Sequence, residues 1–235
     1  MKQLSKTRSV IYHLYPGLLI TLAFIVLAPL SIRYGYPPQF GMLLCIILVA
    51  IPVLTIHLIR AKKQENLSKI ASLNGFTNRL PAVKLILYTF GLVIAAFVIW
   101  GITQPADLYV SKHFFTSLPA WFTVQGFGGY SSEKIKITLI LNLMLNGIIA
   151  PYAEEIYFRG YLLARMNAWG KYAFVANAIL FSLYHFWQPY VYLTLILSLL
   201  PMIYMVNKTR DMRLGILTHS MMNIIGALLS FAMTR

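Results

Sequence analysis

Two adjacent glutamates, Glu154 and Glu155, lie in an apolar run that extends from Ile148 to Phe158. An ionisable side chain at the centre of a membrane helix costs about 2.5–3.5 kcal/mol on insertion scales, so such a residue indicates a function. On a helix, Arg159 shares a face with Glu155, in the order that favours an ion pair. Glu154 points about 100° away and has Phe158 as its fourth neighbour. We therefore expect Glu155 and Arg159 to pair, which leaves Glu154 free to face the bundle interior.

Two histidines and an asparagine also lie in apolar runs expected to be helical. His185 follows Phe181 by four residues, and Asn223 follows His219 by four, so each pair shares a helix face. With about 1.5 Å of rise per residue, Glu154, His185, His219 and Asn223 reach the same layer of the bilayer from three different spans. The other acidic residues and histidines lie in loops or near span ends, where we expect ordinary solvated or interfacial side chains. They are Glu65, Asp107, Glu133, Asp211, His13, His57 and His113.

This combination of side chains suits the hydrolysis of a peptide bond. Glu154, aided by His185, can take a proton from an attacking water. His219 and Asn223 can then donate hydrogen bonds to the oxyanion, which elsewhere contributes about 3–4 kcal/mol per donor. Glu155, Arg159 and Phe181 would support the site. We expect no cofactor.

Two other kinds of chemistry stay open at these residues. Glu154, His185 and His219 could instead supply three zinc ligands and leave a fourth position for water, although the spacing is not that of a helical H-E-x-x-H site. Ser182 and Ser220 lie nearby, but neither is placed as in a Ser-His-Asp arrangement, so a nucleophilic mechanism is the weaker alternative.

Membrane helices must carry these residues. The chain has 235 residues, of which 59% are hydrophobic and 11% charged, whereas a soluble domain is about 25% charged. A membrane helix needs about 20 mostly apolar residues. We therefore predict an all-α polytopic membrane protein with seven transmembrane helices, or eight if the connection after the third span hides another. The expected spans are approximately 12–32, 40–60, 84–103, 136–166, 172–188, 189–206 and 211–233.

The distribution of charge predicts the orientation. Lysine and arginine number 20, against six acidic residues, and the basic residues lie in short segments between apolar runs. Basic residues concentrate on the cytoplasmic side. With a cytoplasmic N-terminus, fourteen fall on the inner side and five on the outer side. The outer five are Arg33, Lys112, Lys134, Lys136 and Arg235. We expect an integral membrane protein whose partners are the lipid bilayer and a peptide or membrane-protein substrate, not nucleic acid.

We predict that residues 1–235 form a single membrane domain. Residues 1–130 would hold N-terminal spans and an interfacial loop without a recognisable signature, and residues 135–233 the catalytic core. The loop, about residues 104–133, is rich in aromatic residues and glycine. Aromatic side chains prefer the membrane–water boundary, so the loop either lies at the interface or gates substrate entry.

Three motifs in this order resemble those of the CPBP family. They are Glu154-Glu155-x-x-x-Arg159, Phe181-x-x-x-His185 and His219-x-x-x-Asn223. This family comprises the type II CAAX prenyl endopeptidases and related bacterial Abi or bacteriocin-processing proteins. The resemblance covers about residues 135–233.

The resemblance implies an all-helical intramembrane endopeptidase whose site opens to the cytosol and which forms no covalent intermediate. Glu154 and His185 would activate water without a metal, and His219 with Asn223 would form the oxyanion hole. It also implies CAAX-like processing, or peptide pheromone or bacteriocin maturation and self-immunity in a bacterium. Two other functions stay open: a non-catalytic immunity or binding protein, and a proton-coupled transporter. The sequence shows no inverted repeat that would support the transporter.

Overall fold

The computed structural model describes residues 1–122 and 127–232, and within these ranges the chain forms helices and no β-strand. One isolated β-bridge joins Thr77 to Asp211. The structure confirms the all-α membrane fold that the sequence predicts. Residues 123–126 of the expected loop, and Arg235 of the expected outer cations, lie outside the described residues.

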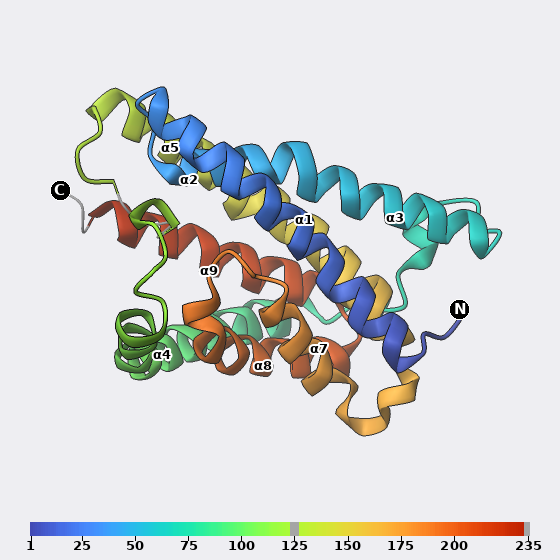
Figure 1. The fold of residues 1–235 in the computed structure, drawn as a ribbon. Coiled ribbons are helices and arrows are strands. Elements are labelled where there is room, and N and C mark those ends of the chain that lie inside the picture. Colours follow the sequence, from blue (N-terminus) through green and yellow to red (C-terminus); the bar gives the residue numbers. More distant parts are fainter. Residues whose placement is uncertain (123–126, 233–235) are drawn as a thin grey trace.

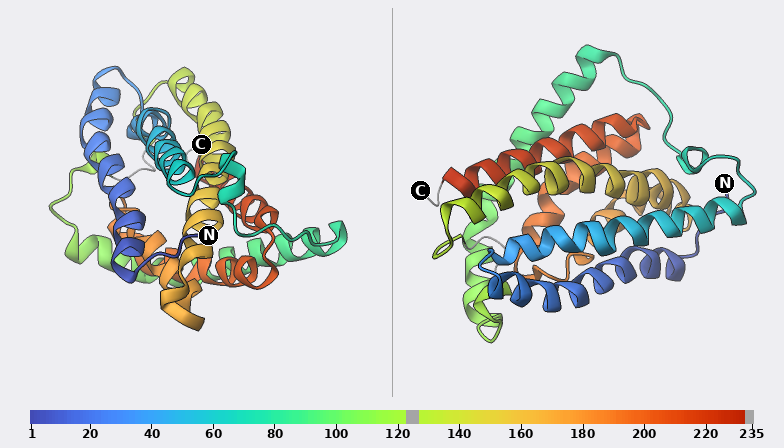
Figure 2. Two further views of the ribbon diagram at one scale, coloured as in Figure 1. Left: turned by 90° about the vertical axis from the view of Figure 1, so that its right-hand side faces the viewer. Right: turned by 90° about the horizontal axis from the view of Figure 1, so that it is seen from above.

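The helices of the first half run α1 (Lys6–Arg33), α2 (Pro38–Cys45), η1 (Ile46–Ala50), α3 (Ile51–Gln64), η2 (Ile70–Leu73), α4 (Ala82–Phe114) and η3 (Ala120–Phe122). Those of the second half run α5 (Ser132–Met144), η4 (Leu145–Ile149), α6 (Ala150–Glu154), η5 (Glu155–Leu162), η6 (Leu163–Arg165), η7 (Asn167–Tyr172), α7 (Ala173–Leu183), η8 (Pro189–Val191), α8 (Tyr192–Thr209) and α9 (Met212–Ala232). Figure 2 shows α4 crossing the other long helices steeply, and α4 packs on α8 and α9.

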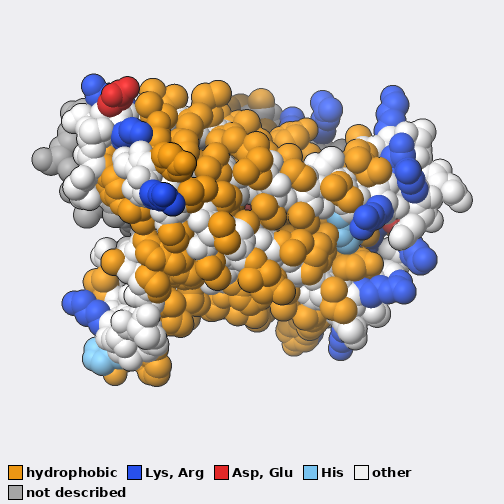
Figure 3. Space-filling view, turned by 45° about the horizontal axis from the view of Figure 1, so that its top comes forward, with side chains coloured by type: hydrophobic (Ala, Val, Ile, Leu, Met, Phe, Trp, Pro, Cys, Tyr) orange, Lys and Arg blue, Asp and Glu red, His pale blue; other side chains and the backbone are white. Residues whose placement is uncertain are grey.

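Six helical stretches of the described chain are long and apolar enough to cross a membrane. They are Lys6–Arg33, Pro38–Gln64, Ala82–Phe114, Ser132–Arg165, Pro189–Thr209 and Met212–Ala232. Helix α4 continues to Phe114, so much of the expected loop 104–133 is helical. Large apolar side chains such as Leu22, Val26 and Ile94 are exposed on these helices. Figure 3 shows them as a broad apolar surface between two ends that carry the Lys and Arg side chains, as a surface facing lipid requires.

The fifth expected span, 172–188, is only partly helical. Helix α7 has 11 residues and ends at Leu183. The start of α7 lies near Arg165, whose carbonyl accepts a hydrogen bond from the N–H of Leu4 close to the N-terminus. Beyond the turn, Tyr190 contacts Phe115, which directly follows the C-terminal end of α4. This passage therefore combines a short helix with an irregular turn. The N-terminus and the end of α9 accordingly lie at opposite ends of the bundle (Figure 1).

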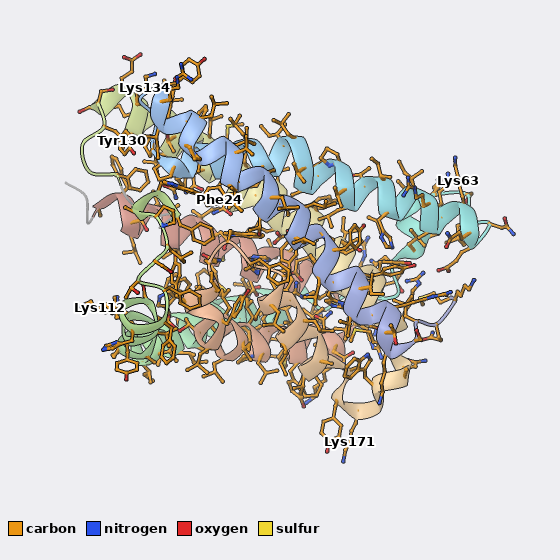
Figure 4. All side chains as sticks on the ribbon, in the orientation of Figure 1. Phe24, Lys63, Lys112, Tyr130, Lys134 and Lys171 are labelled. Atoms are coloured by element: carbon orange, nitrogen blue, oxygen red, sulfur yellow. The ribbon has the colours of Figure 1, made fainter. Side chains whose placement is uncertain are left out.

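The two ends of the bundle differ in charge as the expected spans require. Lys63 and Lys171 lie at the end that holds the N-terminus, whereas Lys112 and Lys134 lie at the opposite end (Figure 4). The N-terminal end receives the basic segments after α3, after η6 and after α8. We call it the basic end.

Ion pairs in which one partner is buried hold loops against the helices at the basic end. Arg165 donates from Nε and Nη2 to the Glu65 carboxylate, at 3.0 and 3.2 Å, and from Nη1 to the carbonyl of Leu73. Asp211 accepts from the N–H of Leu80 at 2.7 Å and pairs with Arg213 at 2.6 Å. Burial opposes ionisation of Asp211, yet these donors hold the pKa of its carboxyl below the usual value.

Two acidic residues expected to be solvated are buried instead. Asp211 is 1% exposed because the loop before α4 folds over it, and Asp107 is 7% exposed within α4. Thr194 on α8 donates a 2.6 Å hydrogen bond to Asp107. The charge pattern could not show this, because Asp107 and Asp211 are covered by segments that lie 87 and 131 residues away in the sequence.

Candidate active site

One continuous helical stretch, Ser132–Arg165, carries both adjacent glutamates, and its winding changes around them. After α5 come the π-helical turn η4, the short helix α6 with Pro151, and the π-helical turn η5 that begins at Glu155. Proline has no N–H to donate, so one helical hydrogen bond is missing at Pro151. Such π-helical turns occur frequently at functional sites.

Glu155 connects two helices through a single carboxylate oxygen. Its Oε1 lies 3.1 Å from Nη1 of Arg159 and 3.0 Å from Nδ1 of His219 on α9. The side chains of Glu155 and Arg159 are both fully buried. The Arg159 contact is an ion pair by distance but lacks the angles of a hydrogen bond, so the guanidinium and Oε2 of Glu155 have no hydrogen-bond partner within the described chain. Glu155 thus fixes the rotation of the His219 ring.

Gly215 allows α9 to approach this carboxylate. A Cβ atom built on Gly215 would lie 2.5 Å from Oε2 of Glu155, closer than real Cβ contacts. Gly215 is one turn before His219 on the same face of α9. The small residue therefore lets the imidazole reach Glu155 without a shift of the helix.

We expect Gly215→Ala to disrupt the site, because either the Glu155 carboxylate or α9 must move. Peptide cleavage should fall at least about tenfold, since misplacing a catalytic group by about 1 Å can cost a hundredfold. Gly226→Ala on the same helix is the matched control, because a Cβ there meets nothing within 4 Å. Replacing a helical glycine by alanine should stabilise that control by about 0.5–1 kcal/mol. Equal cleavage rates for both variants and the unmodified protein would contradict this role.

Glu154 is the glutamate that water can reach. Its side chain is 11% exposed, whereas that of Glu155 is fully buried. The hydroxyl of Tyr184 donates to Oε1 of Glu154 at 3.2 Å, and Oε2 lies 3.9 Å from Nε2 of His219. A separation of 3.9 Å exceeds a hydrogen bond and suits a bridging water. Glu154 therefore lacks the tight partners that occupy Glu155.

His185 lies in the irregular turn after α7, not within a helix as the sequence suggests. Its Nδ1 is 2.9 Å from the carbonyl oxygen of Phe181. A carbonyl only accepts, so Nδ1 carries the proton and the neutral ring presents an unprotonated Nε2. Non-helical backbone at membrane depth is tolerated only where protein covers it or where it lines an aqueous cavity. The turn thus presents a basic nitrogen in the interior of the bundle.

Phe181 packs against both imidazoles and the buried cation. Its ring is edge-on to His185 and His219, with centroids 5.0 and 6.0 Å apart, and the Arg159 guanidinium lies 3.9 Å from its centre. No hydrogen bond or ion pair joins His185 directly to Glu154 in the described part of the chain. The aromatic contacts of Phe181 and Tyr184 connect the two residues instead.

Asn223 lies one turn beyond His219 but is tied to a different segment. Its Nδ2 donates a 2.8 Å hydrogen bond to the backbone carbonyl of Asn146 in η4. The carboxamide nitrogen carries two hydrogens, so one N–H remains for another acceptor. The structure thus joins Glu154, Glu155 and His219, places His185 beside them, and holds Asn223 at the margin of the group.

Tyr184 and Gly215 belong to the site, although the sequence analysis did not select them. Both had a signal: Tyr184 directly precedes His185, and Gly215 occurs four residues before His219. Among the residues that the structure describes, no group of three or more His, Cys, Asp or Glu side chains is arranged to hold a metal ion. The hydroxyl of Ser182 donates to the Ala178 carbonyl and is fully buried, so it is not placed as a nucleophile.

Comparison with known proteins gives a match over the segment that carries these residues. Residues 136–225 match the family model described as type II CAAX prenyl endopeptidase Rce1-like. This range includes every residue of the site described above. No curated protein and no solved structure matches the chain.

Proposed function

We propose that the chain is an intramembrane endopeptidase in which Glu154 activates water, because residues 136–225 match the family model of Rce1-like type II CAAX prenyl endopeptidases. The family implies a protease and a membrane setting. The proposal adds the roles of individual residues, the metal-independent mechanism and the class of substrate. It rests mainly on the contrast between two adjacent carboxylates, of which Glu154 alone retains contact with solvent.

The first step is the addition of water to the peptide carbonyl. The Glu154 carboxylate removes a proton from the water, whose oxygen bonds to the carbonyl carbon as the carbonyl π electrons move to oxygen. Nε2 of His185 accepts a hydrogen bond from the same water and orients it, because Nδ1 is occupied by the Phe181 carbonyl. General-base catalysis of this kind contributes about 10²–10⁴ in rate.

The second step is the breakdown of the tetrahedral intermediate. His219 and Asn223 donate hydrogen bonds to the oxyanion. Because Nδ1 of His219 donates its hydrogen to Glu155, Nε2 can donate only when the ring is doubly protonated. The oxyanion re-forms the carbonyl as the carbon–nitrogen bond breaks, and the protonated Glu154 returns its proton to the departing amine. No bond forms between enzyme and substrate, and no cofactor takes part.

The substrate we propose is a peptide or membrane protein whose scissile bond enters the bundle from the basic end. We place this end, with the N-terminus, in the cytoplasm of a bacterium, because basic residues gather on the cytoplasmic side. The family is named for prenylated CAAX substrates. In a bacterium, the corresponding substrates would be pheromone or bacteriocin precursors, with a role in maturation or self-immunity.

Removal of metal tests whether Glu154 acts alone. Cleavage of a panel of membrane peptides by the purified protein should persist after dialysis against a strong chelator, with zinc well below one atom per chain. If chelation abolishes cleavage and added Zn²⁺ restores it, the zinc alternative with Glu154, His185 and His219 as ligands replaces the proposal. If no peptide in the panel is cleaved under any condition, the non-catalytic alternative is favoured.

A further inference from the structure

A cavity of about 480 Å³ lies between α1 and α3, separate from the candidate active site. Helix α1 packs on α2 and η1. Helices α1 and α3 then diverge toward the basic end (Figure 1). The lining residues come from these helices alone: Tyr12, Tyr15, Leu19, Val53, Ile56, His57, Arg60, Ala61 and Gln64.

The lining is polar at one end and apolar at the other. Helices α1 and α3 run in opposite directions, so Tyr12, Arg60 and Gln64 lie at the basic end of the cavity. Leu19 and Val53 lie deeper in the membrane, with Val53 about 10 Å from Arg60 along the helix. Leu19 and Ile56 are 41% and 47% exposed on the outer surface of the bundle, so the apolar part of the cavity is open to lipid.

The polar end is rich in hydrogen-bond donors and holds an unpaired cation. Arg60 is exposed and makes no ion pair within the described chain. The hydroxyl of Tyr15 and Nδ1 of His57 form a 2.9 Å hydrogen bond, whereas Nε2 of His57 has no partner among the described residues. The carboxylate of Glu65, which lines a smaller adjacent cavity, is already bound by Arg165.

His57 is held rigidly in place. It was expected to be an ordinary interfacial histidine, but tyrosine rings surround it. Its ring contacts Tyr12, Tyr15, Tyr157 and Tyr161, with centroids 4.4 to 5.8 Å apart. Tyr157 also lies 3.2 Å from Nδ1 and donates to the Tyr12 carbonyl. The His57 ring at the polar end is therefore held in place without a ligand, which lowers the entropy cost of binding one there.

We propose that this cavity binds one anionic phospholipid, with its phosphate at Arg60, His57 and Tyr12 and an acyl chain along Leu19, Val53 and Ile56. Arginine and several N–H or O–H donors match the charge and oxygens of a phosphate. Basic pockets between membrane helices on the cytoplasmic side typically bind such headgroups. A smaller adjacent cavity shares Tyr12, Ala61 and Gln64 and adds Lys2 and Arg8, which extends the cationic surface available to the headgroup. This site does not depend on the proposed peptidase activity.

Native mass spectrometry of the full chain in detergent tests the proposal. The protein would be titrated with phosphatidylglycerol, with phosphatidylcholine of the same acyl chains, and with inorganic phosphate. We expect one phosphatidylglycerol to bind at a concentration several times lower than phosphatidylcholine. Arg60→Gln should weaken phosphatidylglycerol binding about fivefold, as expected for one cation near a phosphate.

Lys63→Gln is the matched control, because it removes one exposed charge a single turn away on α3 and lines neither cavity. It should change binding less than about twofold. Val53→Trp, which fills the apolar end without changing charge, should also weaken phosphatidylglycerol. Equal effects of Arg60→Gln and Lys63→Gln, equal binding of both lipids, unchanged binding to Val53→Trp, or displacement of the lipid by phosphate alone would each overturn the proposal.

Discussion

Glu154→Gln is expected to reduce peptide cleavage by about 10²–10⁴ while leaving the fold intact. Glutamine is nearly isosteric with glutamate, and its Oε1 can still accept the hydrogen bond that Tyr184 donates. Among the described residues, Glu154 makes no ion pair with Lys or Arg, and Nε2 of His219 lies 3.9 Å from its Oε2. The substitution therefore removes the proton acceptor with little loss of packing. Cleavage of a defined peptide by purified protein, followed by mass spectrometry, measures the effect.

Glu133→Gln is the control for this variant. Glu133 is an exposed acid at the first turn of α5 and belongs to the same helical stretch. We expect its cleavage rate to remain within about twofold of that of the unmodified protein. Full cleavage by Glu154→Gln, at unchanged protein concentration and thermal stability, would exclude Glu154 as the base. Loss of cleavage together with loss of the folded state would be a structural effect and would equally contradict the expected result.

Substitutions at Glu155 and Arg159 should instead destabilise the fold. Both side chains are fully buried, so removing one partner leaves an uncompensated charge inside the bundle. Breaking a buried pair in this way typically costs about 3–5 kcal/mol. Glu155→Gln and Arg159→Met should each lower the midpoint of thermal unfolding in detergent by many degrees. Cleavage should fall as well, because Glu155 no longer fixes His219.

The double variant Glu155→Gln/Arg159→Met separates pairing from general loss of packing. It removes both charges and leaves neither one unpaired. Residues in direct contact typically show coupling energies of about 0.5–3 kcal/mol. We therefore expect the double variant to be more stable than the sum of the two single effects predicts. Strict additivity, or single variants as stable as the unmodified protein, would show that the pair does not hold the site together.

The sequence predicted those features that arise from local spacing. Four-residue separation and opposite charge were enough to suggest the pair of Glu155 with Arg159, which the structure places 3.1 Å apart. Apolar runs of sufficient length located the long helices. The rise per residue also predicted a common depth in the membrane for Glu154 and His219. In the structure, their side chains lie 3.9 Å apart. These features depend on helix periodicity and on the length of apolar sequence that crosses a membrane. Both can be read directly from a sequence.

Features that depend on packing between distant segments were not predictable. The turn at His185 interrupts an apolar run that looks helical throughout, because no glycine or proline marks the position where α7 ends. The sequence predicted that His219 contacts the oxyanion, but it did not predict the contact of His219 with Glu155. That contact depends on the close approach of α9 that Gly215 allows. The tyrosines around His57 come from α1 and η5, which are far from α3 in the sequence, so their convergence has no counterpart in local sequence.

Hydrolysis in water enriched in ¹⁸O, with hydroxylamine present during a single turnover, most directly tests whether water at Glu154 attacks the substrate without a covalent intermediate. The new C-terminal carboxylate should carry one ¹⁸O atom, and no hydroxamate of the product should form. A hydroxamate would instead reveal an acyl-enzyme, formed on a side chain such as Ser220, and would contradict direct attack by water.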